Sequence, residues 1–214
     1  MSLHNRSGMA ALAAGVVVAL AGPAQAGLLV IGDPLNSTEN TGCDFTAQLD
    51  YLYNGGNSGT LSVLLTNTTS GSIGGFITAF VFNIASSDPG RAGVLFSTTD
   101  PDFEDAGGES ANPFGSPFDA GASTSGGFEG GGPPSRGIGV GSSATFVFDI
   151  TASDAGSLDE TSFINGPYAF DFIVRFRGLV DGGSDKVPGK LIPAPGGAAA
   201  LLCGAGLMSL RRRR

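Results

Sequence analysis

The residues best suited to a chemical role are four carboxylates within six positions: Asp100, Asp102, Glu104 and Asp105. Carboxylate oxygens are the hard ligands that Ca²⁺ prefers, so this run is a candidate calcium site. The run does not have the spacing of an EF-hand loop, and Pro101 limits how its neighbours can converge. A solvent-exposed acidic turn is the competing interpretation, and it is the one that the sequence favours.

Histidine chemistry is excluded from most of the chain. The only histidine is His4, which lies in a predicted signal peptide. Catalysis by Ser-His-Asp or Cys-His groups and metal sites with histidine ligands are therefore not expected. The sequence also has no Gly-x-Ser-x-Gly elbow and no phosphate-binding Gly-x-x-x-x-Gly-Lys-Ser/Thr loop. Hydrolysis of a glycoside by a pair of Asp or Glu residues remains an alternative function. Nothing in the sequence identifies such a pair among the 19 acidic residues. We predict that the protein is not an enzyme and needs no cofactor, with Ca²⁺ as the one candidate ligand ion.

A sugar-binding module is a further alternative. The chain has no Trp, and its tyrosines are only Tyr51, Tyr53 and Tyr168, so flat aromatic platforms for sugar rings are scarce. The acidic residues Asp181 and Asp185 could join a binding site. The stretch from Asp181 to Gly189 itself is expected to be an exposed exit from the last strand.

The hydrophobic pattern is that of strands. Apolar and polar residues alternate with a period of two, which places one set of side chains inward and the other in water. One segment is apolar on both faces, which suits a central strand covered on both sides. The expected strands are 28–31, 47–53, 61–65, 76–84, 94–96, 146–150 and 168–176.

Between these strands lie Gly-, Asn- and Pro-rich turns, and little of the chain is helical. Residues 157–163 form the one helical candidate, of one or two turns at most, with Ser157 and Glu160 at capping-box spacing. Residues 97–141 are rich in Gly, Ser and Pro and predict a long, partly ordered loop that Phe103, Phe114 and Phe118, together with Phe128, pin onto a sheet. Residues 27–190 are therefore expected to form one all-β domain, an antiparallel two-sheet β-sandwich of jelly-roll type.

The expected domain is strongly acidic. Residues 27–190 contain all 19 acidic residues of the chain and six basic ones, a formal charge of −13. Such a surface disfavours nucleic acid and anionic lipid as partners. The domain also contains a single cysteine, Cys43, so no disulfide can form within it, and Cys43 is predicted to be a small buried residue.

The N-terminal residues 1–26 predict a signal peptide. An uncharged apolar run from Met9 to Gly22 precedes Ala24 and Ala26, whose small side chains match a signal-peptidase site. The run is shorter than the roughly 20 residues that a membrane span needs. Cleavage after Ala26 would make Gly27 the first residue of an exported protein.

The C-terminal residues 191–214 have three parts in a fixed order. Pro193, Ala194 and Pro195 are followed by an uncharged span, 196–210, and then by Arg211, Arg212, Arg213 and Arg214. As a helix the span would be about 22 Å long, which is short for the hydrocarbon layer of about 30 Å. The arginines would stay on the cytoplasmic side by the positive-inside rule. A short transmembrane helix that anchors the protein at least transiently in the cytoplasmic membrane is expected.

This tail resembles the PEP-CTERM sorting signals of bacterial exosortase substrates, as a Pro-Ala-Pro variant of the planctomycete-like type. The resemblance covers residues 193–214, and Ala194 stands where Glu is usual. It implies processing at Pro193–Pro195 by an exosortase-like membrane enzyme, release to the cell surface or the extracellular space, and association with exopolysaccharide.

Two functions follow as expectations. The first is an exported cell-surface or extracellular-matrix protein with a non-catalytic β-sandwich. The alternative is a Ca²⁺- or glycan-binding module of the cell envelope.

Overall fold

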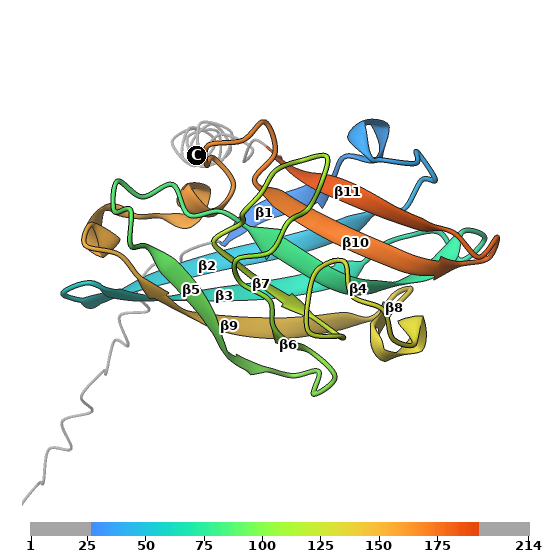
Figure 1. The fold of residues 1–214 in the computed structure, drawn as a ribbon, viewed down its shortest axis with the longest axis horizontal. Coiled ribbons are helices and arrows are strands. Elements are labelled where there is room, and N and C mark those ends of the chain that lie inside the picture. Colours follow the sequence, from blue (N-terminus) through green and yellow to red (C-terminus); the bar gives the residue numbers. More distant parts are fainter. Residues whose placement is uncertain (1–26, 193–214) are drawn as a thin grey trace, which may run out of the picture.

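The computed structural model describes residues 27–192, which form an antiparallel all-β domain (Figure 1). Its strands are β1 (Leu28–Gly32), β2 (Phe45–Gly55), β3 (Ser58–Asn67), β4 (Gly74–Phe82), β5 (Ala92–Thr98), β6 (Glu104–Asp105), β7 (Ala120–Ser123), β8 (Ile138–Gly139), β9 (Ser143–Thr151), β10 (Phe172–Leu179) and β11 (Ser184–Leu191). Short 3₁₀ helices occupy η1 (Pro34–Asn36), η2 (Pro134–Arg136), η3 (Ala155–Ser157) and η4 (Glu160–Phe163). The predicted all-β antiparallel class is confirmed.

The strands follow one continuous path of hydrogen bonds, where two separate sheets were expected. The order is β5-β9-β3-β2-β1-β11-β10-β4-β7-β6, and β8 pairs with β4. Strands β1 and β11 together make this continuity, because β1 pairs with β2 and with β11, and β11 also pairs with β10. The sheet curls until it is nearly closed into a barrel, with β4, β10 and β11 lying across β2, β3 and β9 (Figure 1).

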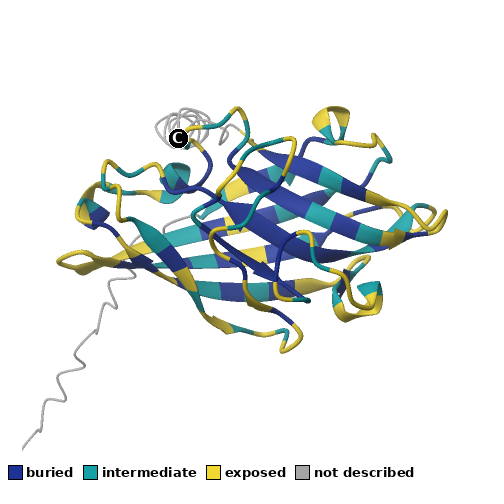
Figure 2. Cartoon of the chain, viewed as in Figure 1, coloured by how far each residue is buried: buried dark blue, intermediate teal, exposed yellow. Residues whose placement is uncertain are grey.

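The period-two pattern of the sequence produces the core. Inward side chains of β3 and β9 are fully buried while the residues between them reach the surface, as the alternating colours of Figure 2 show. Aromatic rings meet in the centre: Phe80 lies 4.8 Å from Phe146 and Phe82 lies 5.0 Å from Phe148, measured between ring centroids, and both pairs meet edge to face. Such pairs add stabilisation beyond that of their buried area.

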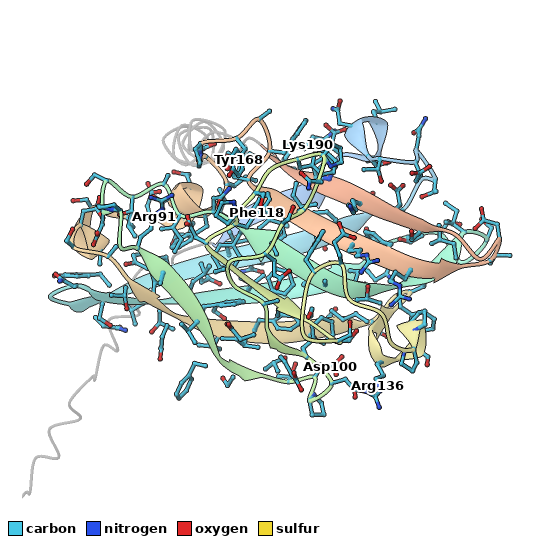
Figure 3. The ribbon with its side chains drawn as sticks, in the orientation of Figure 1. Arg91, Asp100, Phe118, Arg136, Tyr168 and Lys190 are labelled. Atoms are coloured by element: carbon cyan, nitrogen blue, oxygen red, sulfur yellow. The ribbon has the colours of Figure 1, made fainter. Side chains whose placement is uncertain are left out.

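The long loop 97–141 covers the outer face of β4 and β10. A second apolar cluster forms there, in which Phe118 and Phe128 pack with Val81 and Ile173. Phe118 also meets Tyr168 edge-on, at 5.5 Å between ring centroids (Figure 3). The aromatic side chains therefore hold the loop on the sheet, as the sequence predicts, and the segment 76–84 is covered on both faces.

The loop contains strands that the sequence analysis did not predict. Strand β7 has the sequence Ala-Gly-Ala-Ser, whose small residues give no hydrophobic alternation. Its backbone pairs with β4, and a Cβ on Gly121 would lie 2.5 Å from the carbonyl oxygen of Phe80. Small side chains are what this close approach requires, and they also hide the strand from a pattern search.

Strand β11 corrects the expectation for residues 181–189. These residues were predicted to be an exposed exit, because they include Gly189 and Pro188 among polar residues. Instead, 184–191 is a strand between β10 and β1, in which Val187, Pro188 and Gly189 are buried. Pro188 lies just beyond the residues that pair with β1, where its missing N–H breaks no backbone hydrogen bond with that strand.

The helical candidate 157–163 contains only short turns, as predicted: the end of η3 and the whole of η4. Its capping box is corrected, because it joins Asp159 to Ser162 in place of Ser157 and Glu160. Cys43 is buried and unpaired by any disulfide, as predicted. Within residues 27–192, no helix combines the length and the apolar character that a membrane span requires.

Candidate functional site

The four predicted calcium ligands lie along one edge of the molecule and do not form a cluster. Asp100 begins a turn in which its Oδ1 accepts the backbone N–H of Asp102, at 3.2 Å. Asp102 Oδ1 is 3.7 Å from the Nε of Arg136, in an exposed ion pair. Glu104 is exposed on β6.

Asp105 uses its carboxylate to close the sheet. Its Oδ1 accepts the backbone N–H of Leu95 at 2.7 Å, and so links β6 to the free edge of β5. Three of the four carboxylates thus serve a turn, an ion pair and an edge contact, and the fourth, Glu104, is exposed. Among residues 27–192, no three His, Cys, Asp or Glu side chains lie close enough together to hold a metal ion.

The other predicted sites fall mostly outside the described residues. Ala24 and Ala26 precede them, and so does the rest of the signal peptide, 1–26. The sorting motif, Pro193–Pro195, and the basic stop, Arg211–Arg214, follow them. Gly27 is the first described residue and leads directly into β1.

Among the described side chains, that of Asp185 on β11 makes the most hydrogen bonds. It is only 1% exposed. Its two oxygens accept hydrogen bonds from three hydroxyl groups and three backbone N–H groups. The donors are Ser37 Oγ (3.0 Å), Thr38 Oγ1 (3.0 Å), Thr41 Oγ1 (2.6 Å), and the backbone nitrogens of Glu39 (3.0 Å), Thr41 (3.1 Å) and Lys186 (2.8 Å).

These contacts set the charge state of Asp185. Burial by itself raises the pKa of this carboxyl, but the hydrogen bonds from Thr41, Glu39 and Ser37 outweigh burial, and the pKa lies below its ordinary value. The carboxylate therefore stays ionised and holds the loop 37–41 against β11. The Asp185 carboxylate thus connects the loop to the strand, and its two oxygens are occupied by hydrogen bonds within the domain.

Beside this tie lies an open, polar hollow of about 460 Å³. It is formed by segments distant in the sequence: the loop 38–39, the loop 112–113, Glu129, Arg175 of β10, and the start of β11. A second hollow of about 440 Å³ shares Glu39 with it and extends toward the turn that joins β10 to β11.

Charged side chains form the floor of the first hollow. Glu129 contacts both the Nζ of Lys186 and, at 3.7 Å, the Nη2 of Arg175. Lys186 Nζ also donates to the backbone oxygen of Asn112, at 2.5 Å. Burial lowers the pKa of Arg175, and the neighbouring Glu129 opposes this.

Two arginines of β10 hold the Gly-rich part of the loop through its carbonyl groups. Arg175 Nη1 donates to the oxygens of Phe128 and Gly130, both at 2.8 Å. Arg177 Nη1 donates to Gly131 at 2.7 Å and to Gly132 at 3.1 Å. This fixes Glu129 at the edge of the hollow.

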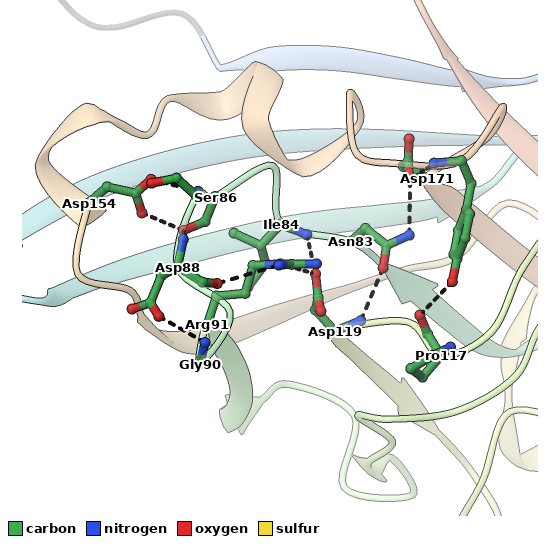
Figure 4. A network of polar contacts seen from close by, with 12 residues as sticks. Asn83, Ile84, Ser86, Asp88, Gly90, Arg91, Pro117, Asp119, Asp154 and Asp171 are labelled. Carbon is green, nitrogen blue, oxygen red and sulfur yellow. Dashed lines mark hydrogen bonds and ion pairs between the residues drawn. The ribbon is translucent and has the colours of Figure 1, made fainter.

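A second polar network ties together the loops at the other end of the domain (Figure 4). Asn83 Nδ2 donates to Asp171 Oδ1 at 2.9 Å, and Asn83 Oδ1 accepts the N–H of Asp119 at 3.2 Å. Asp119 in turn accepts the N–H of Ile84 and the Nε of Arg91, both at 2.8 Å. Burial raises the pKa of Asp171 above its ordinary value, although the hydrogen bond from Asn83 opposes it.

Asp154 extends this network into the loop 86–91. It accepts hydrogen bonds from the hydroxyl of Ser86 and from the backbone and hydroxyl of Ser87, the last two at 2.8 Å. The hydrogen bond from Ser86 contributes most to lowering the pKa of Asp154 to about 2. Asp88 supports the same loop by accepting the N–H groups of Gly90 and Ser153.

The residues of the hollow other than Asp185 were not singled out by the sequence analysis. They are single polar residues in turns, without a shared spacing. The one available signal was the pair Arg175 and Arg177, two cations at period two on a strand of an acidic domain. Their position opposite a Gly-rich loop could not be read from spacing.

No protein-family model, curated protein or solved structure matches the chain.

Proposed function

We propose that this protein is an exported, non-catalytic domain of the cell surface or extracellular matrix, delivered by a PEP-CTERM-like C-terminal sorting signal. In this proposal residues 1–26 are a signal peptide. Residues 193–214 are a sorting and anchor segment with a short transmembrane helix, on which an exosortase-like enzyme acts. The described domain is then a jelly-roll-like sandwich formed by the two halves of the curled sheet.

The observation that carries the proposal is the position of the two ends of the domain. Strand β1 begins at Leu28, and the antiparallel strand β11 beside it ends at Leu191. Leu191 pairs with Val30, and the N–H of Ile192 donates to the carbonyl of Leu29, at 3.3 Å. Segments 1–26 and 193–214 therefore leave the domain at the same end of two neighbouring strands.

This arrangement suits a domain that is tethered at one end. The points at which both segments join the domain are neighbours, and the opposite ends of β1 and β11 are free to face outward. The carboxylates support the same role, because Asp185 and the network of Asp119 and Asp154 bind loops to strands. The formal charge of −13 over residues 27–190 keeps such a domain soluble outside the cell.

The test is the intact mass of the protein recovered from the medium and from the membranes of the cells that encode it. Wild type is compared with a variant in which Arg211–Arg214 are replaced by Ala, and with a control in which they are replaced by Lys. We expect a wild-type product that begins at Gly27 and ends near Pro193–Pro195. The Ala variant should lose this processing, whereas the Lys control keeps the positive charge and should retain it.

Two results would count against the proposal. A full-length chain that begins at Met1 in the cytoplasm would refute export. An exported chain that keeps residues 196–214 would make it a membrane-anchored protein and remove the sorting signal from the proposal.

A further inference from the structure

The hollow between β10, β11 and the loop 112–113 contains hydrogen-bonding groups that are not used within the described domain. Over residues 27–192, the carboxylate of Glu39, the side-chain amide of Asn112 and the hydroxyl of Ser184 make no hydrogen bond. Lys186 uses its Nζ for Glu129 and the backbone of Asn112, which leaves one of its three N–H donors. All four groups line the same hollow of about 460 Å³.

These free groups include both donors and acceptors. Glu39 can only accept, Lys186 can only donate, and Asn112 and Ser184 can do both. An anionic ligand would need donors, and a cationic ligand would need acceptors. A ligand with many hydroxyl groups needs both at once, because each hydroxyl donates one hydrogen bond and accepts others.

The charges of the floor lead to the same ligand class. The lining contains two cations, Arg175 and Lys186, and three carboxylates, those of Glu39, Glu129 and Asp185, so its formal charge is −1. A hollow without net positive charge disfavours a phosphate, sulfate or carboxylate group as ligand. Pro113 adds an apolar patch to the lining, which suits the C–H face of a sugar ring.

We propose that this hollow binds a neutral polysaccharide through the side chains of Glu39, Asn112, Ser184 and Lys186. The second hollow of about 440 Å³ shares Glu39 and gives a chain-like ligand room to continue past it. The inference rests on the proposed function, because only an exported domain meets extracellular polysaccharide. The inference adds to that function the surface at which an extracellular polysaccharide would bind.

The test uses the full chain, purified in a polyoxyethylene detergent, because a glycosidic detergent would compete for a sugar site. Its retention is measured on four immobilised neutral polysaccharides: dextran, mannan, galactan and cellulose. Alginate is the anionic comparison. We expect retention on at least one neutral polysaccharide and weaker retention on alginate.

The matched variants are Glu39→Gln with Asn112→Ala, and Glu104→Gln as a control on the exposed strand β6. Removing a charged acceptor and an amide should weaken binding by about tenfold to a hundredfold. The control should bind like wild type. Both side chains in the double variant are exposed and make no hydrogen bond among the described residues, so its thermal unfolding should match that of wild type.

Three results would overturn the inference: no retention on any neutral polysaccharide, retention on alginate alone, or equal binding by the double variant. The mass measurement of the exported product separates this outcome from failure of the proposed function. An exported and processed protein that binds no neutral polysaccharide would refute the site and leave the export proposal intact.

Discussion

Replacement of Asp185 by Asn tests whether the buried carboxylate is the main tie between β11 and the loop 37–41. The Asn amide is nearly the same size, so packing is retained while the charge and one acceptor are lost. If the new NH₂ group takes the Oδ2 position, the hydroxyls of Ser37 and Thr41 can rotate to accept from it. The backbone N–H of Thr41 cannot, and it is left without a partner.

The expected cost follows from these contacts. One stranded buried N–H costs about 1–3 kcal/mol. The three donors on Oδ1 exchange a charged acceptor for a neutral one, at about 1 kcal/mol each. We therefore expect the free energy of unfolding to fall by about 4–6 kcal/mol, which corresponds to about 15 °C in Tm for a domain of this size.

The assay is denaturant unfolding at neutral pH, with Asp181→Asn as the control. Asp181 is exposed and accepts only the N–H of Gly183, at 2.8 Å, so its variant should lie within about 0.5 kcal/mol of wild type. A variant Asp185→Asn that unfolds within about 0.5 kcal/mol of wild type would refute the role assigned to this carboxylate.

Three further predictions concern the loops and their charges. Arg175→Ala should release the Gly-rich loop around Gly130, so that protease cleaves this loop at least tenfold faster than in wild type. Arg136→Ala is the control, because the Arg136 side chain takes part in an exposed ion pair, and its cleavage rate should not change. Equal cleavage rates in the two variants would contradict the structural role of the contacts between Arg175 and the loop carbonyls. The pKa of Asp154 is lowered to about 2, so its contribution to stability is full above its ordinary value of 3.8 and is lost as pH falls toward 2. Acid unfolding curves should therefore show a smaller loss of stability between pH 4 and pH 2 for Asp154→Asn than for wild type, and identical curves would refute this. Neither millimolar Ca²⁺ nor a chelator should change Tm, because the carboxylates of Asp100–Asp105 do not cluster around a common point. A rise in Tm of several degrees with Ca²⁺ would show that they do bind the ion together.

The core was predictable because it depends on local alternation. Inward positions of the strands, such as Val63 on β3 and Phe148 on β9, follow from period two alone, and both are fully buried. The pins of the long loop were predictable for a similar reason. Large aromatic side chains in a stretch of Gly and Ser are expected to be buried against the rest of the domain, and here they pack on the outer face of β4 and β10.

Two elements were not predictable because their sequences lack this pattern. Strand β7 consists of small residues that allow a close backbone approach, and β11 contains Pro188 and Gly189 among polar residues. Both are held by backbone hydrogen bonds to neighbouring strands, and such bonds leave no hydrophobic alternation in the sequence. The single continuous sheet follows from β11, since it is this strand that joins β1 to β10.

The sequence by itself determined the all-β class, the buried faces of most strands and the acidic character of the domain, because each of these is a property of neighbouring residues. Only the tertiary structure decided which carboxylates are ties and where a ligand could lie. Asp185 meets its hydroxyl partners 144 to 148 positions away along the chain, and the hollow unites the segments around residues 39, 112, 129, 175 and 185. Such contacts form only when the curled sheet brings β10 and β11 against the loops around residues 39 and 112. The local spacing of residues in the sequence does not predict these long-range contacts.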